Sequence, residues 1–170
     1  MPISYALIAR STAVLAEFST KEDNATEVAR AVLQKLPFGE MRISYIVDGS
    51  QLHVLVVKPD ERASGTLCVM CLAEEAFGRR LPFAFLEEIL QRFISAYGKL
   101  AGMALTQSYN TEFSRVLFQQ MQYFTANANL GLSISTPHMA IKKGPVQKVE
   151  QVLGNDRSVH LLSDKTDPLQ

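Results

Sequence analysis

Apolar residues run almost without interruption through the first stretch of the chain, from Ile3 to Arg10. Such a run predicts a strand that is buried on both faces at the centre of a sheet. Ser11-Thr12 is a short break, and residues 13–18 predict a second strand that runs back beside the first. A hairpin that begins at residue 3 leaves no room for a secretory signal, so we expect no targeting peptide here.

The next segment has helical spacing between two local signals. Asn24, with Glu27 three residues later, resembles a capping box and predicts the helix start. Pro37-Phe38-Gly39 predicts its end. The apolar positions between these signals recur every four residues: Val28, Val32 and Leu36.

Three further strands are expected in the middle of the chain, at residues 42–47, 51–57 and 66–72. Asp48-Gly49 joins the first two and is a strong hairpin signal. Residues 58–65 read as a charged loop before the third, which is again almost wholly apolar.

Two amphipathic helices are expected next, one after Arg79-Arg80-Leu81-Pro82 and one from Tyr109. The polar face of the first helix is predicted from Glu87, Glu88, Gln91 and Arg92. The apolar positions of the two helices are Phe85, Leu86, Ile89, Leu90, Phe93, Ile94 and Tyr97, and then Phe113, Val116, Leu117, Met121 and Phe124. This order of elements predicts an α+β domain of about 125 residues, with five mainly antiparallel strands and helices on both faces.

The character of the chain changes at Ala126. Residues 126–149 carry no clean period and read as a mobile linker. Residues 150–170 regain helical spacing and predict a tail that is partly helical or disordered.

The net charge and the lengths of the apolar runs argue against a nucleic-acid-binding protein and against a membrane-spanning chain. Lys plus Arg equals Asp plus Glu, at 17 each, so no global field directs the chain to nucleic acid or anionic lipid. No stretch approaches 18 uninterrupted apolar residues, so the chain as given is not expected to span a bilayer.

Cys68 and Cys71 have the CxxC spacing of zinc and redox sites. Positions three apart on a strand face opposite sides, so the two sulfurs are expected to be separate core thiols in a reducing, cytosolic setting. The histidines, His53, His138 and His160, lie in different segments. With no nucleophile, base and oxyanion donor in any recognisable motif, we expect neither a cofactor nor a metal, and no enzyme activity.

Ile43 and Tyr45 share one face of their strand because they lie two positions apart. Two hypotheses follow. Both side chains pack under a helix, or they line a groove beside the first helix that is open to the apolar stripe of a partner.

Several separate segments of residues 1–125 resemble the longin domain of the long R-SNAREs, the longin-bearing vesicle-associated membrane proteins. These segments are residues 3–12, Lys35-Leu36-Pro37, residues 83–86 and residues 109–114. The resemblance implies a profilin-like fold and a binding role.

Residues 150–169 are similar to the middle of an R-SNARE coiled-coil motif, most specifically at Leu161-Leu162 and Asp164-Lys165-Thr166. The family carries an arginine at the central layer, where this chain has Asn155, and Gly144-Pro145 interrupts any helix entering the motif. The membrane anchor of the family is absent from this sequence. The positions that align with core layers are Val152, Asn155, Val159, Leu162, Thr166 and Leu169.

The resemblance implies a trafficking and fusion protein on the cytoplasmic face of endosomes, lysosomes or vacuoles and transport vesicles. Its longin groove, expected at Ile43 and Tyr45 with Val28 and Val32 on the helix wall, would bind the C-terminal segment of the same chain. Q-SNARE proteins, trafficking adaptors and regulators of small GTPases are the expected partners. The alternative is a non-fusogenic longin adaptor or tethering-complex-like subunit that does not enter SNARE bundles.

Overall fold

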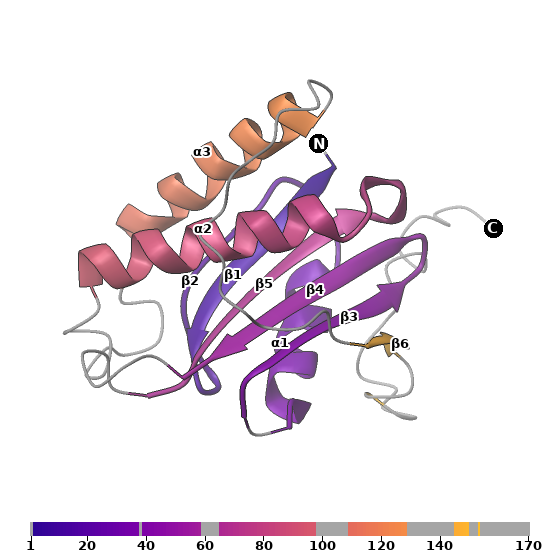
Figure 1. The fold of residues 1–170 in the computed structure, drawn as a ribbon, viewed down its shortest axis with the longest axis horizontal. Helices are drawn as coiled ribbons and strands as arrows, with labels where there is room; N and C mark the ends of the chain where they lie inside the picture. The colour runs from indigo at the N-terminus through magenta and orange to yellow at the C-terminus, as the bar shows by residue number, and fades with distance from the viewer. Residues whose placement is uncertain are drawn as a thin grey trace.

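The computed structural model describes residues 2–37, 39–58, 65–97, 109–128, 145–149 and 153. Within these ranges, six strands form one sheet in the order β2-β1-β5-β4-β3-β6 (Figure 1). The strands are β1 (Ile3–Arg10), β2 (Ala13–Ser19), β3 (Met41–Val47), β4 (Ser50–Val57), β5 (Leu67–Glu74) and β6 (Val146–Lys148). All neighbours are antiparallel except β3 and β6, which run parallel. The five expected strands and the α+β class are therefore confirmed.

Helices cover both faces of the sheet, as expected. Helix α1 (Ala25–Lys35) packs on one face, and α2 (Arg80–Tyr97) and α3 (Asn110–Ala128) pack on the other (Figure 1). A short 3₁₀ turn, η1 (Glu75–Phe77), precedes α2. No helix in the described ranges has the length and hydropathy needed to cross a bilayer.

Two local predictions about turns and side-chain direction are confirmed. Asp48 and Gly49 both have positive φ, 42° and 75°, as the tight β3–β4 hairpin requires. Cys68 is buried in the core layer under α1, and Cys71 in the layer under α2 and α3. The two thiols therefore lie on opposite faces of β5.

The predicted capping box of α1 is wrong. Asn24 occupies the cap position, but its side chain is buried and makes no hydrogen bond to the helix. The Ala25 N–H, at the first helical position, donates to Oδ1 of Asp23 at 2.9 Å, so the preceding carboxylate satisfies one N–H of the first turn.

Glu87 was expected on the polar face of α2 and is buried instead. Its carboxylate forms an ion pair with Arg42 of β3, and both side chains are nearly inaccessible. The guanidinium of Arg42 also stacks on Phe83, one turn before Glu87. A charge partner 45 residues earlier allows this carboxylate to face the sheet, because a paired charge can be buried.

The outer edge of β2 is covered by the beginning of α3. The Tyr109 N–H donates to the Leu15 carbonyl at 3.2 Å, and the Glu17 N–H donates to Oδ1 of Asn110 at 3.1 Å. Leu15 is also the extra residue where the β1–β2 register shifts. Capped groups and a bulge both prevent another strand from pairing at this edge.

Strand β6 lies inside the segment expected to be a linker. It is three residues long and carries no alternating pattern, so the sequence contained no local signal for it. The division into residues 1–125, 126–149 and 150–170 stays a prediction.

Candidate functional site

The four predicted groove residues lie together in the layer between α1 and the sheet. Val28 and Val32 of α1 and Ile43 and Tyr45 of β3 belong to one buried cluster, and each is 6% exposed or less. The helix ending at Lys35 places the valines one turn apart on its inner face, and the strand places Ile43 and Tyr45 on the same side. These side chains pack against α1, and Val149 and Leu153 from the end of the chain belong to the same cluster; a groove that binds a partner stays a prediction.

Residues 145–149 extend the sheet beyond β3. The Ser44 N–H donates to the Pro145 carbonyl at 3.1 Å, and the register pairs Ser44 with Val146 and Ile46 with Lys148. Strand β6 thereby covers the edge that β3 would otherwise present.

Two apolar side chains of the same segment enter the groove cluster. Val149 is fully buried and Leu153 is 5% exposed, both with helical backbone. They join the cluster that contains Val28 and Tyr45. At the end of α1, Nζ of Lys35 donates to the Leu153 carbonyl at 3.0 Å. The described part of the C-terminal segment is therefore attached at an edge strand, at an apolar cluster and at one lysine.

The buried tail residues differ from the predicted SNARE layers. Leu153 lies one position after the aligned layer at Val152, and Val149 precedes every aligned layer. A shift of one position rotates a side chain by about 100° on a helix. All six predicted layer positions, Val152, Asn155, Val159, Leu162, Thr166 and Leu169, lie outside the described residues.

Three groove-site residues were missed by the sequence analysis: Val149, Leu153 and Lys35. The i, i+4 spacing of Val149 and Leu153 is a weak helical signal that the alignment to layers obscured. No local pattern identifies Lys35, because its partner lies 118 residues away.

The wall of the groove formed by α1 is tied to the first hairpin. The Tyr5 hydroxyl donates to Oε2 of Glu17 at 2.7 Å, and Arg30 of α1 forms an ion pair with the same carboxylate. Burial, then the Glu17 charge, raises the pKa of Tyr5 well above its usual range. Burial likewise raises the pKa of Tyr45, so both phenols are neutral at physiological pH.

Behind the groove, Ser44 connects the β3 edge to the opposite face of the sheet. Nε of Arg79 donates to the Ser44 hydroxyl at 3.0 Å, and the hydroxyl lies 2.8 Å from Nδ1 of His53. With Arg79 donating, the hydroxyl hydrogen is free to donate to Nδ1. Burial, and secondly the Arg79 charge, lowers the pKa of His53 to about 4, so its ring is neutral.

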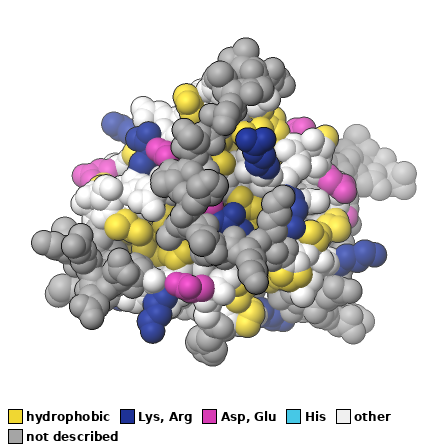
Figure 2. Space-filling view, in the orientation of Figure 1, with side chains coloured by type: hydrophobic (Ala, Val, Ile, Leu, Met, Phe, Trp, Pro, Cys, Tyr) yellow, Lys and Arg dark blue, Asp and Glu magenta, His cyan; other side chains and the backbone are white. Residues whose placement is uncertain are grey.

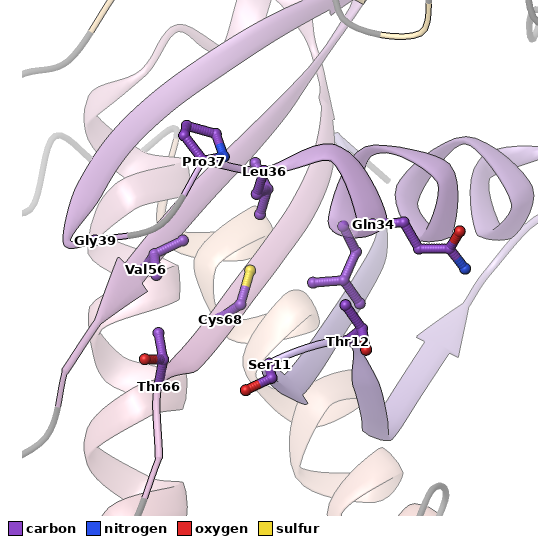
Figure 3. Close-up of a pocket in the computed structure, with 10 residues that line it drawn as sticks. Ser11, Thr12, Gln34, Leu36, Pro37, Gly39, Val56, Thr66 and Cys68 are labelled. Carbon is purple, nitrogen blue, oxygen red and sulfur yellow. The ribbon is translucent and has the colours of Figure 1, made fainter.

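A cavity of about 160 Å³ lies in the same layer, at the C-terminal end of α1 (Figure 3). Cys68 rises from β5 into it between Val56 of β4 and the turn residues Ser11 and Thr12 (Figure 3). Burial raises the pKa of the Cys68 thiol far above its usual range, so it is a poor nucleophile. Among the described residues, no three His, Cys, Asp or Glu side chains form a group that could hold a metal.

The opposite face, formed by α2 and α3, shows charges of both signs scattered among apolar patches (Figure 2). The groove residues thus form an apolar cluster beside the β3 edge, where residues 145–149 add backbone pairing, an arrangement that suits the binding of a peptide segment.

Comparison with known proteins identifies the family. Residues 15–117 match the model of the longin family, described as a regulated-SNARE-like domain. The chain is 40% identical over 173 residues to vesicle-associated membrane protein 711 of Arabidopsis thaliana, covering 100% of this chain and 76% of that relative. It is 39% identical to vesicle-associated membrane protein 712 of the same plant, with the same coverage. It is 33% identical over 162 residues to vesicle-associated membrane protein 7B of Dictyostelium discoideum, covering 95% of this chain and 57% of the relative.

Proposed function

This chain belongs to the longin-bearing vesicle-associated membrane proteins, R-SNARE proteins of vesicle trafficking and fusion, and we propose that its longin groove binds its own C-terminal segment. In this closed state the segment is withheld from Q-SNARE proteins. The role is one of binding and not of catalysis.

The observation that carries the proposal is the contact of Val149 and Leu153 with the groove that contains Tyr45. Burying each of these side chains contributes on the order of 1.5–3 kcal/mol. The backbone hydrogen bond at Ser44 and the hydrogen bond from Lys35 fix the direction in which the segment lies on the domain. Because the segment is tethered to the domain, its effective concentration is roughly millimolar, so a weak site suffices to hold it.

Opening then follows from competition. Q-SNARE helices bind the freed segment, while trafficking adaptors or regulators of small GTPases occupy the vacated groove. Each such ligand shifts the equilibrium between the closed and open states only by the difference between its affinities for the two. We place this cycle on the cytoplasmic face of endosomes, lysosomes or vacuoles and transport vesicles, with a membrane anchor outside this sequence.

The test uses the full chain and the Tyr45→Ser variant. The variant removes the aromatic wall of the groove, so amide protection of residues 150–166 should fall while the domain stays folded. Truncating a buried aromatic ring costs about 3–5 kcal/mol, so a thermal melt must accompany the exchange measurement. Unchanged protection of residues 150–166 in a folded variant contradicts the closed state.

Mixing with three Q-SNARE helices separates this proposal from the adaptor alternative. An R-SNARE gives an SDS-resistant complex, with Asn155 at the central position. A chain that never enters the complex, at any ratio of helices, is instead a non-fusogenic longin.

A further inference from the structure

Lys35 is the last residue of α1, and its ammonium group does not serve that helix. A lysine in the last turn usually interacts with the carbonyls of its own helix. Here Nζ donates to the Leu153 carbonyl at 3.0 Å, while the Leu153 side chain is buried in the groove cluster. A single residue of the tail is thus held at both its side chain and its backbone.

The carbonyl that Lys35 occupies has a specific role in a continuous helix. In an α-helix the carbonyl of residue 153 accepts the N–H of residue 157. Residues 150–169 resemble the SNARE motif, so a SNARE bundle requires this hydrogen bond. A carbonyl oxygen has two lone pairs, so it can accept both the Lys35 ammonium group and the N–H of residue 157. The ammonium group competes with that N–H for the oxygen without preventing the helical hydrogen bond.

We propose that Lys35 is a positioning residue that holds the docked segment at Leu153. This inference rests on the closed state proposed above and names the residue that regulates it. Lys35 releases the Leu153 carbonyl as the segment leaves the groove, which frees that carbonyl for a helical hydrogen bond in a SNARE bundle.

The experiment compares Lys35→Ala, Lys35→Arg and the matched control Lys21→Ala in the full chain. Lys21 is an exposed lysine in the loop between β2 and α1, away from the groove. Two readouts are taken: amide exchange across residues 149–157, and the rate of SDS-resistant complex formation with three Q-SNARE helices. Melting temperature is measured for every variant.

Lys35→Ala is expected to raise both rates roughly three- to tenfold, the range for losing one charge-assisted hydrogen bond at a partly exposed site. Melting temperature should stay within the spread of the control, because the Lys35 side chain is exposed. Lys35→Arg keeps a charged donor and should remain near wild type. A merely structural lysine would lower the melting temperature without changing the two rates.

Failure of this inference differs from failure of the closed state. The Ser44 amide, which donates to the Pro145 carbonyl, reports docking independently of Lys35. If Ser44 is protected in the wild type and Lys35→Ala changes neither rate, the role of Lys35 is wrong and the closed state stands. If Ser44 exchanges freely in the wild type, both are wrong.

Discussion

Replacing Val149 and Leu153 by alanine should open the groove without altering the longin domain or any aligned SNARE layer. Both side chains are nearly inaccessible, at 0% and 5% exposed, and both contact the cluster between α1 and β3. The alternative target, Tyr45, also belongs to the core of the domain. The tail variant therefore separates docking from folding more cleanly than a groove variant does.

The magnitude follows from the atoms removed. Val→Ala deletes two carbon groups and Leu→Ala three, at about 0.8 kcal/mol for each buried group. The double variant thus weakens docking by about 4 kcal/mol as an upper value, because the groove relaxes and the free tail is not fully extended. This corresponds to a factor of roughly 1,000 in the closing equilibrium.

Two assays measure the effect. Exchange of the Ser44 amide should accelerate as strand β6 leaves β3, and complex formation with Q-SNARE helices should become faster. Val146→Ala is the matched control, since Val146 lies on β6 and is 43% exposed. It should change docking by less than about 0.5 kcal/mol. Wild-type protection of Ser44 in the double variant would refute the reasoning, because no other described tail contact buries comparable apolar area.

Two further predictions concern the stability of the domain that carries the groove. Asn110→Ala removes the acceptor of the Glu17 N–H, so it should lower the free energy of unfolding by about 1–2 kcal/mol and speed exchange of the Glu17 amide. The control is Asn127→Ala, which loses only an exposed hydrogen bond within α3. Equal urea midpoints for the two variants would contradict the prediction. The pKa of His53 is about 4 in the fold and 6.5 when unfolded, so the unfolded state binds more protons between these pH values. The free energy of unfolding should therefore fall by about 3 kcal/mol as the pH drops from 6.5 to 4. Urea titrations at several pH values should show this slope in the wild type and not in His53→Gln.

The parts of the fold with local signals could be predicted from the sequence. Strands β1 and β5 are continuous apolar runs, and Asp48-Gly49 has the backbone preference that the hairpin requires. The opposite orientation of Cys68 and Cys71 followed from the period of a strand alone.

The remaining features depend on partners far away in the chain. Glu87 is buried because Arg42 lies across from it, and β6 forms because the edge of β3 is available. Neither relation leaves a pattern in its own segment. Asn24 takes the predicted cap position, but its side chain is buried without a hydrogen bond, and Asp23 accepts the Ala25 N–H.

The same limit applies to the groove. The spacing of Ile43 and Tyr45 placed both side chains on the face of β3 that packs against α1, whereas the intramolecular ligand implied by the resemblance to longin domains stays a prediction. The tail residues that join the cluster, Val149 and Leu153, are not among the aligned layers, and only the packing of the fold reveals them.

Residue-resolved exchange of the Ser44 amide in the full chain, before and after addition of three Q-SNARE helices, tests the closed state most directly. The closed state predicts strong protection of Ser44 in the chain alone, because its N–H is bonded to the Pro145 carbonyl. Protection should be lost in step with the appearance of the SDS-resistant complex. A Ser44 amide that exchanges freely from the start, or that stays protected in the assembled complex, would contradict the account.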